Sequence, residues 1–226
     1  PDPFAAAPVP AQPALTQSQA VVVAGPVETI TVTVQWQGPS VGRGAGADVD
    51  GTLAADVLSA VVNDERSAMT RRLVDAGNFQ SVGFGYQTLA HTGPVTFTGV
   101  TTADKLAGAL TALAAELDMM AVDGYFEPQA LADAAKRRRV DQALEAEEGP
   151  ALAHTLGFWW GIAGLDYHAG YDRGLAAQTP ATLQRFVARY LARKPFVVGA
   201  LVPPGQERAT EAMLKQFVEF TAGEGQ

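Results

Sequence analysis

The chain has 226 residues, enough for one large domain, and 47% of them are hydrophobic, enough to bury a sizeable core. A formal net charge of −8 argues against nucleic acids and anionic membranes as partners, because both bind through Lys and Arg. The absence of Cys excludes disulfides, thiolate zinc sites and Cys nucleophiles. No apolar stretch approaches the roughly 20 residues that a membrane-spanning helix needs.

The N-terminal part of the chain divides into a linker, a strand and a loop. Residues 1–19 contain five prolines, which predicts an extended linker ahead of a single α+β domain over residues 20–226. The prolines and the lack of an initiating Met also indicate a fragment or processed chain that continued N-terminally. Apolar and polar side chains alternate over residues 27–36, which predicts a strand with one buried face. We interpret the glycine-rich residues 38–51 as a flexible connection, because they lack the Lys-Ser/Thr ending of a P-loop.

The spacing of apolar residues changes to a helical period after this loop. It predicts a helix over residues 52–62, with Asp50 or Thr52 as its N-cap. A second, short helix is predicted over residues 67–75, and Gly77 is placed to end it.

The remainder of the chain completes a two-layer pattern. Strand-like runs at 80–89 and 95–101 predict an antiparallel hairpin, and the continuous apolar run at 196–202 predicts an interior strand. The apolar helix that carries Trp159 and Trp160 fits either a core or an interface. Together these elements predict an α+β fold: a mostly antiparallel sheet with helices mainly on one face. Further helices are predicted over residues 102–120, 128–148, 151–164, 167–177, 180–191 and 206–220.

The histidine pattern argues against a zinc site in this chain. A catalytic zinc needs three protein ligands, often two His on one helix face. None of His91, His154 and His168 is followed by another His after three or four residues, and no His-x-x-Glu-His motif is present. We interpret His154 as buried on an apolar helix and His168 as a surface partner of Asp172. Residues 38–42 (GPSVG) have the Gly-x-Ser-x-Gly spacing, but they lie in a long glycine-rich loop and not in the tight strand-to-helix turn of a nucleophile elbow. The residues alone therefore predict no catalytic constellation and no metal.

A succession of short segments across residues 15–204 nevertheless resembles a known family. The order and spacing of these segments are similar to the C-terminal, non-catalytic domain of the pitrilysin/insulinase-type zinc metallopeptidases. The segments are 33–39 (TVQWQGP), 54–59 (AADVLS), 71–77 (RRLVDAG), 83–86 (GFGY), 156–160 (LGFWW), 185–190 (RFVARY) and 194–199 (KPFVVG).

The resemblance implies a duplicated α+β unit, in which two halves enclose a chamber for peptides. One half carries zinc on an inverted His-x-x-Glu-His helix, and the other has lost the metal site but completes the chamber. Because this chain lacks the motif, it resembles the second kind. Zinc is then expected in a partner half, either covalently attached or a separate subunit, and a periplasmic or secreted location is implied by the resemblance alone.

The same resemblance implies three substrate-binding residues. In active relatives the non-catalytic half contributes an Arg and a Tyr seven residues apart, and Arg72 and Phe79 have that spacing here. Arg72 can donate hydrogen bonds to a substrate carbonyl, whereas Phe79 departs from the pattern and has no hydroxyl. Tyr86 is a candidate to supply that hydroxyl. The alternative places Arg72 on a helix surface and Phe79 in the core.

Two functions follow from the resemblance. The first is a non-catalytic half that holds an extended peptide, by strand addition to a sheet edge, for a zinc-bearing partner. The second is a structural or binding module of the same family with no role in proteolysis, which the missing hydroxyl of Phe79 favours.

Overall fold

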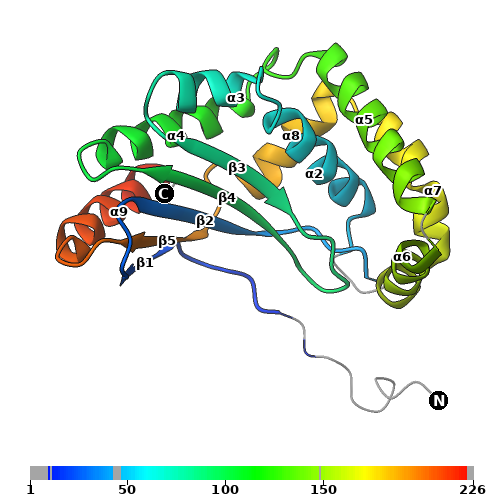
Figure 1. Ribbon diagram of the computed structural model, residues 1–226, viewed down its shortest axis with the longest axis horizontal. Coiled ribbons are helices and arrows are strands. Elements are labelled where there is room, and N and C mark those ends of the chain that lie inside the picture. The colour runs from blue at the N-terminus through cyan, green and yellow to red at the C-terminus, as the bar shows by residue number, and fades with distance from the viewer. Residues whose placement is uncertain (1–9, 11, 43–46, 148, 223–226) are drawn as a thin grey trace.

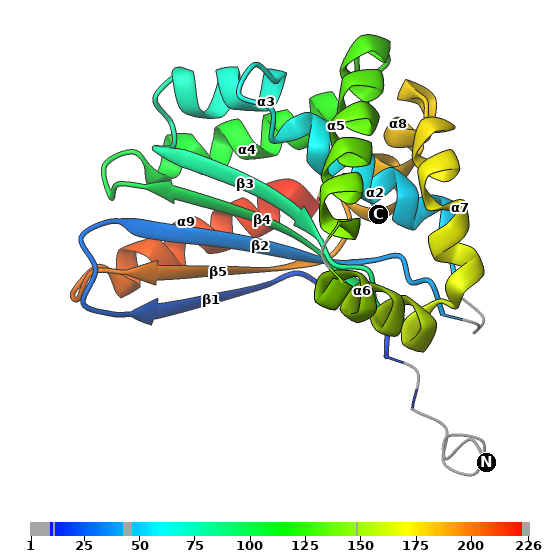
Figure 2. The ribbon, with the colours of Figure 1, turned by 45° about the vertical axis from the view of Figure 1, so that its right-hand side comes forward.

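A five-stranded sheet forms one layer of the structure, and helices cover one of its faces (Figures 1 and 2). The computed structural model describes residue 10 and residues 12–42, 47–147 and 149–222. The strand order is β1-β5-β2-β4-β3, and only β1 and β5 run parallel. The strands are β1 (Gln19–Ala24), β2 (Ile30–Gly38), β3 (Ser81–Tyr86), β4 (Gly93–Thr101) and β5 (Phe196–Val202).

The helices divide into those that contact the sheet and those that extend the molecule at one end. α9 packs on β1 and β5, α8 on β2, and α2 on β3. α5 and α7 pack on α2, and α6 contacts α5 and α7 at the right-hand end of the molecule in Figure 1. The helical segments are α2 (Val49–Val62), α3 (Ala68–Thr70), the π-helical turn η1 (Arg71–Asp75), α4 (Leu106–Met120), α5 (Pro128–Ala146), α6 (Gly149–Ile162), α7 (Leu165–Ala176), α8 (Pro180–Tyr190) and α9 (Glu207–Ala222).

Strand β2 lies in the middle of the sheet and explains how the two layers join. Its apolar residues, from Ile30 to Trp36, are at most 1% exposed and face the helices. The alternate residues face the open side, where Thr33 pairs with Thr98 of β4 and Gly199 of β5. The predicted α+β fold, with a mostly antiparallel sheet and helices on one face, is therefore confirmed.

Element boundaries differ from the predicted ones at the start of α2. The helix begins at Val49, three residues earlier than predicted, because Asp48 is the N-cap and its side chain accepts a hydrogen bond from the Gly51 N–H at 2.9 Å. Asp50 and Thr52 are therefore not the cap. Gly77 does end the following helical segment, and its φ of 79° is a conformation that glycine adopts without steric cost.

The predicted linker and loop lie partly outside the described residues, at 1–9, 11 and 43–46. The described part of the linker is fastened to the sheet. The Gln37 side-chain amide donates to the Pro13 carbonyl oxygen at 2.9 Å, and its oxygen accepts from the Leu15 N–H at 2.7 Å. The Phe196 N–H donates to the Ser18 hydroxyl at 3.2 Å. Strand β1 then begins at Gln19, and no alternation in the sequence predicts it.

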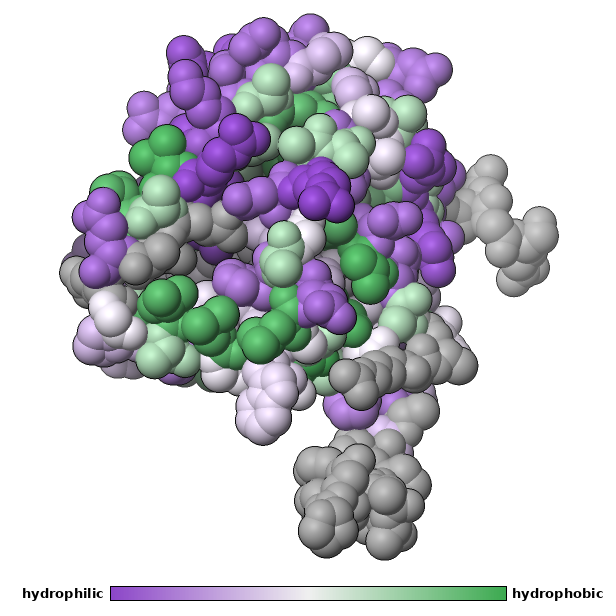
Figure 3. Space-filling model, turned by 90° about the vertical axis from the view of Figure 1, so that its right-hand side faces the viewer, coloured by the Kyte–Doolittle hydropathy of each residue, from purple (hydrophilic) through white to green (hydrophobic). Residues whose placement is uncertain are grey.

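Helix α6 is apolar, yet none of its residues is buried. Trp160 is 75% exposed and Phe158 is 40% exposed. Figure 3 shows apolar residues in a row along the lower part of the face that this end of the molecule presents. The helix is therefore surface rather than core, and His154, predicted to be buried, is exposed because its apolar neighbours do not contact the sheet layer. None of the helices in the described part of the chain is long and apolar enough to cross a membrane.

Candidate functional site

Arg72 occupies the π-helical turn between α3 and β3 and is tied to a buried acid. Its Nη1 atom lies 3.3 Å from each carboxylate oxygen of Glu116, a residue on α4 whose side chain is 0% exposed. The Arg72 side chain itself is 46% exposed. Single π-helical turns inside helices are frequent at functional sites, because they change the direction of their side chains. The arrangement compensates a buried charge and leaves part of the guanidinium in solvent.

Tyr125 completes this cluster from the turn between α4 and α5. Its hydroxyl donates a short hydrogen bond to Glu116 Oε1, and its ring centroid lies 5.5 Å from the Arg72 guanidinium carbon. Burial, followed by the hydrogen bond to Glu116 and the negative charge of that residue, raises the pKa of Tyr125 far above its usual range. The phenol therefore stays protonated and remains a donor to Glu116. Arg72, Glu116 and Tyr125 form one satisfied network, which we call the Arg72 cluster.

Phe79, seven residues beyond Arg72, lies in the core. It is 3% exposed, and its ring packs edge-to-face on Phe97 with the ring centroids 5.6 Å apart. The ring also covers Gly99, where a Cβ atom would lie 2.5 Å from it. A side chain buried to this extent presents little surface to a peptide, and its predicted substrate contact stays a prediction.

Tyr86 lies at the opposite end of β3. The strand separates it from Phe79 by roughly 20 Å, at about 3.3 Å per residue. Its hydroxyl donates to the Pro39 carbonyl oxygen at 3.0 Å, and burial is the main cause that raises the pKa of Tyr86 well above its usual range. The structure thus brings Arg72 and Phe79 to one end of β3 and places Tyr86 at the other. The predicted roles of Arg72 and Tyr86 also stay predictions.

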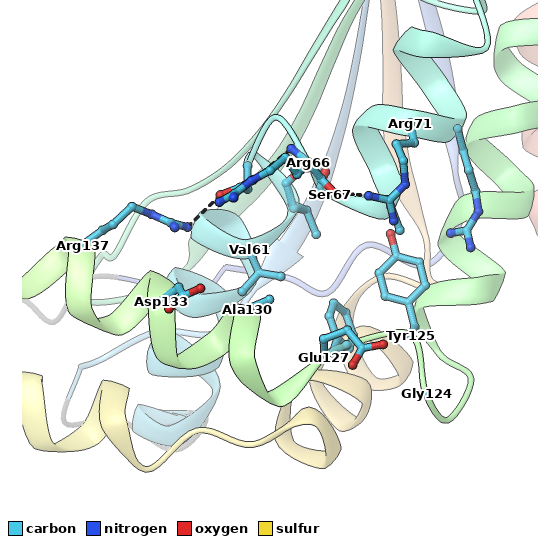
Figure 4. Close-up of a pocket in the computed structure, with 15 residues that line it drawn as sticks. Val61, Arg66, Ser67, Arg71, Gly124, Tyr125, Glu127, Ala130, Asp133 and Arg137 are labelled. Carbon is cyan, nitrogen blue, oxygen red and sulfur yellow. Dashed lines mark hydrogen bonds and ion pairs between the residues drawn. The ribbon is translucent and has the colours of Figure 1, made fainter.

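A pocket of about 390 Å³ opens beside the Arg72 cluster, between the end of α2, the α3–η1 segment and the start of α5 (Figure 4). Its apolar floor includes Val61 and Ala130. Figure 4 shows the Arg71 guanidinium close to the Tyr125 hydroxyl, with Glu127 farther down on the α5 side. The volume lies at the lower end of the range for small-molecule pockets. The pocket lining is Val61, Val62, Asp64, Arg66, Ser67, Ala68, Arg71, Arg72, Gly124, Tyr125, Phe126, Glu127, Ala130, Asp133 and Arg137.

The described residues do not fit a zinc site. Among them, no group of three or more His, Cys, Asp or Glu side chains is placed to hold a metal ion. His91 lies in the β3–β4 connection and His154 on α6, whereas His168 on α7 is stacked on Trp159 with the ring centroids 6.1 Å apart.

Sequence reasoning missed two members of the Arg72 cluster. Leu113, Leu117 and Met120 mark the buried face of α4, and Glu116 lies three residues after Leu113, on the same face. A charged residue on the buried face of a helix indicates that an oppositely charged or hydrogen-bonding partner lies beside it in the fold. Tyr125 gives no comparable signal, because its position depends on the turn that carries it back over α4.

Three comparisons place this geometry among known proteins. No family model and no curated protein matches the sequence. Solved structures do match, with TM-scores that include values from 0.63 to 0.70. They include a protease from Helicobacter pylori (TM-score 0.70, 16% identity, covering 85% of this chain and 46% of that one) and a peptidase M16 inactive domain from Pseudomonas fluorescens (0.65, 16%, 85% and 45%). They also include the inactive peptidase domain of a candidate zinc protease from Bordetella parapertussis (0.68, 15%, 80% and 94%).

The chain has the fold of an M16 peptidase domain. The predicted resemblance to the non-catalytic pitrilysin-type domain is confirmed at the level of the fold. The chain spans about half the length of the Helicobacter pylori and Pseudomonas fluorescens proteins. It spans nearly all of the Bordetella parapertussis domain. The chain therefore corresponds in fold to one such domain.

Proposed function

We propose that this chain is the non-catalytic half of a zinc metallopeptidase and completes a peptide-binding chamber with a zinc-bearing partner half. The observation that carries this proposal is the likeness to an inactive peptidase domain of which the chain covers 94%. The partner would be a chain or domain of the same fold with a His-x-x-Glu-His helix, and zinc would be bound there. A periplasmic or secreted location belongs to the proposal through the resemblance to this family.

The edge of the sheet supports a role in holding peptides. β3 is an edge strand, so one side of its backbone has no partner strand in the described sheet. An extended peptide can add to such an edge through main-chain hydrogen bonds. Arg72 lies on η1, which contacts β3, and Glu116 engages only one of its nitrogens, Nη1. The other guanidinium N–H groups can donate to a peptide carbonyl beside this strand.

A second function, a structural module with no role in proteolysis, is favoured by Phe79. This residue has the spacing of the substrate-contacting Tyr, but it has no hydroxyl and is 3% exposed. If the module only supports assembly, Arg72 contributes to stability through Glu116 and not to substrate binding.

A reconstitution experiment separates the two functions. The purified chain and a zinc-bearing half from the same source are assayed alone and together on a mixture of internally quenched peptides, and zinc is measured in each protein by elemental analysis. We expect substoichiometric zinc in this chain and cleavage that rises strongly when the halves are combined. Equal cleavage by the zinc-bearing half alone would favour the structural module. One tightly held zinc per copy of this chain would contradict the non-catalytic assignment.

The role of Arg72 needs a variant that does not leave Glu116 as an unpaired buried charge. We therefore compare two proteins in the reconstituted assay. One is the double variant, which carries Arg72→Met and Glu116→Gln, and the other carries Glu116→Gln alone. A substrate contact predicts a loss of about tenfold in kcat/KM on removing Arg72 in this background. Unchanged kcat/KM would show that Arg72 does not contact the substrate.

A further inference from the structure

The pocket beside the Arg72 cluster is rich in arginine, although the chain as a whole is acidic. Its lining holds four of the sixteen Lys and Arg residues of a chain whose net charge is −8. The same lining also holds three carboxylates, Asp64, Glu127 and Asp133, so its attraction for an anion depends on which arginines lack a carboxylate partner. The four basic residues are Arg66, Arg71, Arg72 and Arg137.

Three of these arginines already have carboxylate partners. Arg66 and Arg137 both approach Asp64 at 3.3 Å, and Arg72 is held by Glu116. Arg71 is different, because its Nη1 donates to the backbone carbonyl oxygen of Arg66 and no carboxylate among the described residues pairs with it. A guanidinium has five N–H donors in a planar fork, which matches the two oxygens of a carboxylate. Arg71 is exposed and retains donors for an incoming anion.

The remainder of the pocket is suited to the chain that carries such a carboxylate. Val61 and the partly exposed Ala130 line the pocket and offer an apolar floor on which an aliphatic stem can pack. Glu127 and Asp133 line the opposite, α5 side (Figure 4). Both sides of the pocket carry mixed charges, because Asp64 lies beside the α3–η1 arginines and Arg137 lies on α5. A ligand carboxylate is therefore favoured at Arg71, the lining arginine to which no carboxylate among the described residues is paired.

We propose that this pocket binds the carboxylate of a peptide at Arg71, with the attached aliphatic stem on the apolar floor. The carboxylate can be an acidic side chain or the C-terminus of the peptide, since both present the same group. The proposal rests on the proposed function, in that it assumes that the chain handles peptides. It adds the chemical class of peptide, and it makes Arg71, rather than Arg72, the residue that selects it.

Direct binding to the isolated chain tests the proposal. Three fluorescein-labelled peptides of otherwise identical sequence are compared by anisotropy: one with a single Glu and an amidated C-terminus, one with Gln and an amidated C-terminus, and one with Gln and a free C-terminus. We expect at least one carboxylate peptide to bind about tenfold more tightly than the fully neutral peptide. Which of the two does so identifies the source of the carboxylate. The preference should weaken as NaCl is raised, because the charges are solvent-accessible.

Two variants with opposite expected effects sharpen the test. Arg71→Gln should remove most of the preference, whereas Glu127→Gln should tighten binding of the carboxylate peptide by about twofold to fivefold. Arg173→Gln, on the exposed surface of α7, makes the same charge change as Arg71→Gln away from the pocket and should leave the preference intact. Circular dichroism confirms that each variant is folded.

The outcomes distinguish this proposal from the proposed function. Equal binding of all three peptides, or a preference that survives Arg71→Gln, would overturn the carboxylate site while leaving peptide binding in place. The absence of binding by any peptide would also overturn it. Cleavage by the reconstituted halves, which does not depend on this preference, would still decide the proposed function.

Discussion

Removing Arg72 should destabilise the fold because it leaves the buried Glu116 carboxylate without a cationic partner. The Glu116 side chain is 0% exposed, and both of its oxygens lie 3.3 Å from Arg72 Nη1. Deleting one partner of a buried ion pair typically costs about 3–5 kcal/mol. Here the Arg72 side chain is 46% exposed and Tyr125 still donates to Glu116, so water and the phenol compensate part of the loss. We expect Arg72→Met to lower the free energy of unfolding by about 2 kcal/mol, with the Met side chain replacing the apolar stem.

A double-mutant cycle isolates this interaction from the loss of packing. Glu116→Gln removes the charge while keeping an acceptor for Tyr125, and it should cost about 1 kcal/mol. The double variant buries no unpaired charge, so it should be more stable than the sum of the single changes predicts, with a coupling of about 1–2 kcal/mol. Urea unfolding of the four proteins at pH 7.5 measures it. Additive effects, within about 0.3 kcal/mol, would refute the claim that Arg72 neutralises Glu116.

Two further changes test other parts of the structure. Burial raises the pKa of Asp56 from 3.8 to about 6, and the Tyr171 hydrogen bond and Arg138 oppose this shift. The stability that the protonated Asp56 carboxyl contributes is therefore fully present below pH 3.8 and is lost as the pH rises through 6. The stability of Asp56→Asn relative to the unmodified chain should therefore increase between pH 4 and pH 8, by at most about 3 kcal/mol in urea unfolding, and a difference independent of pH would count against this. Gly99→Ala places a methyl group 2.5 Å from the Phe79 ring and should cost about 1–3 kcal/mol in thermal unfolding. The matched change Gly83→Ala, whose Cβ meets nothing within 4 Å, should cost much less, and equal losses would refute the packing assigned to Phe79.

The sequence predicts the parts of the fold whose signal is local. The alternation in β2 and the apolar run of β5 are read directly, because each strand has a constant environment along its length. β1 cannot be predicted in this way, because its six residues follow a proline-rich segment and are held as a strand by pairing with β5. The N-cap of α2 is missed for a related reason: Asp48 belongs to a glycine-rich loop in which any of several polar residues could begin the helix.

The candidate site is less predictable than the fold. Arg72 is found through its spacing to Phe79, but its partner Glu116 lies 44 residues away on another helix. The pocket requires the α3–η1 segment to meet the start of α5, which no local pattern encodes. Arg71 is conspicuous only once the structure gives carboxylate partners to its three neighbouring arginines and none, among the described residues, to Arg71 itself.

The position of β5 in the sheet governs the order in which this chain can fold. Among the described strands, β5 is the last in the sequence, yet it lies between β1 and β2, the first two. The hydrogen bond between Ser18 and Phe196 joins residues that are 178 positions apart. The chain must therefore lose the entropy of closing this loop before the contact can stabilise the fold. During synthesis the β3–β4 hairpin can form early. The apolar β1 stays unpaired until residues 196–202, its partner strand, have been synthesised. We expect insertion of β5 to be the slow step, and the interval before it to be when the chain is most exposed to aggregation and to chaperones.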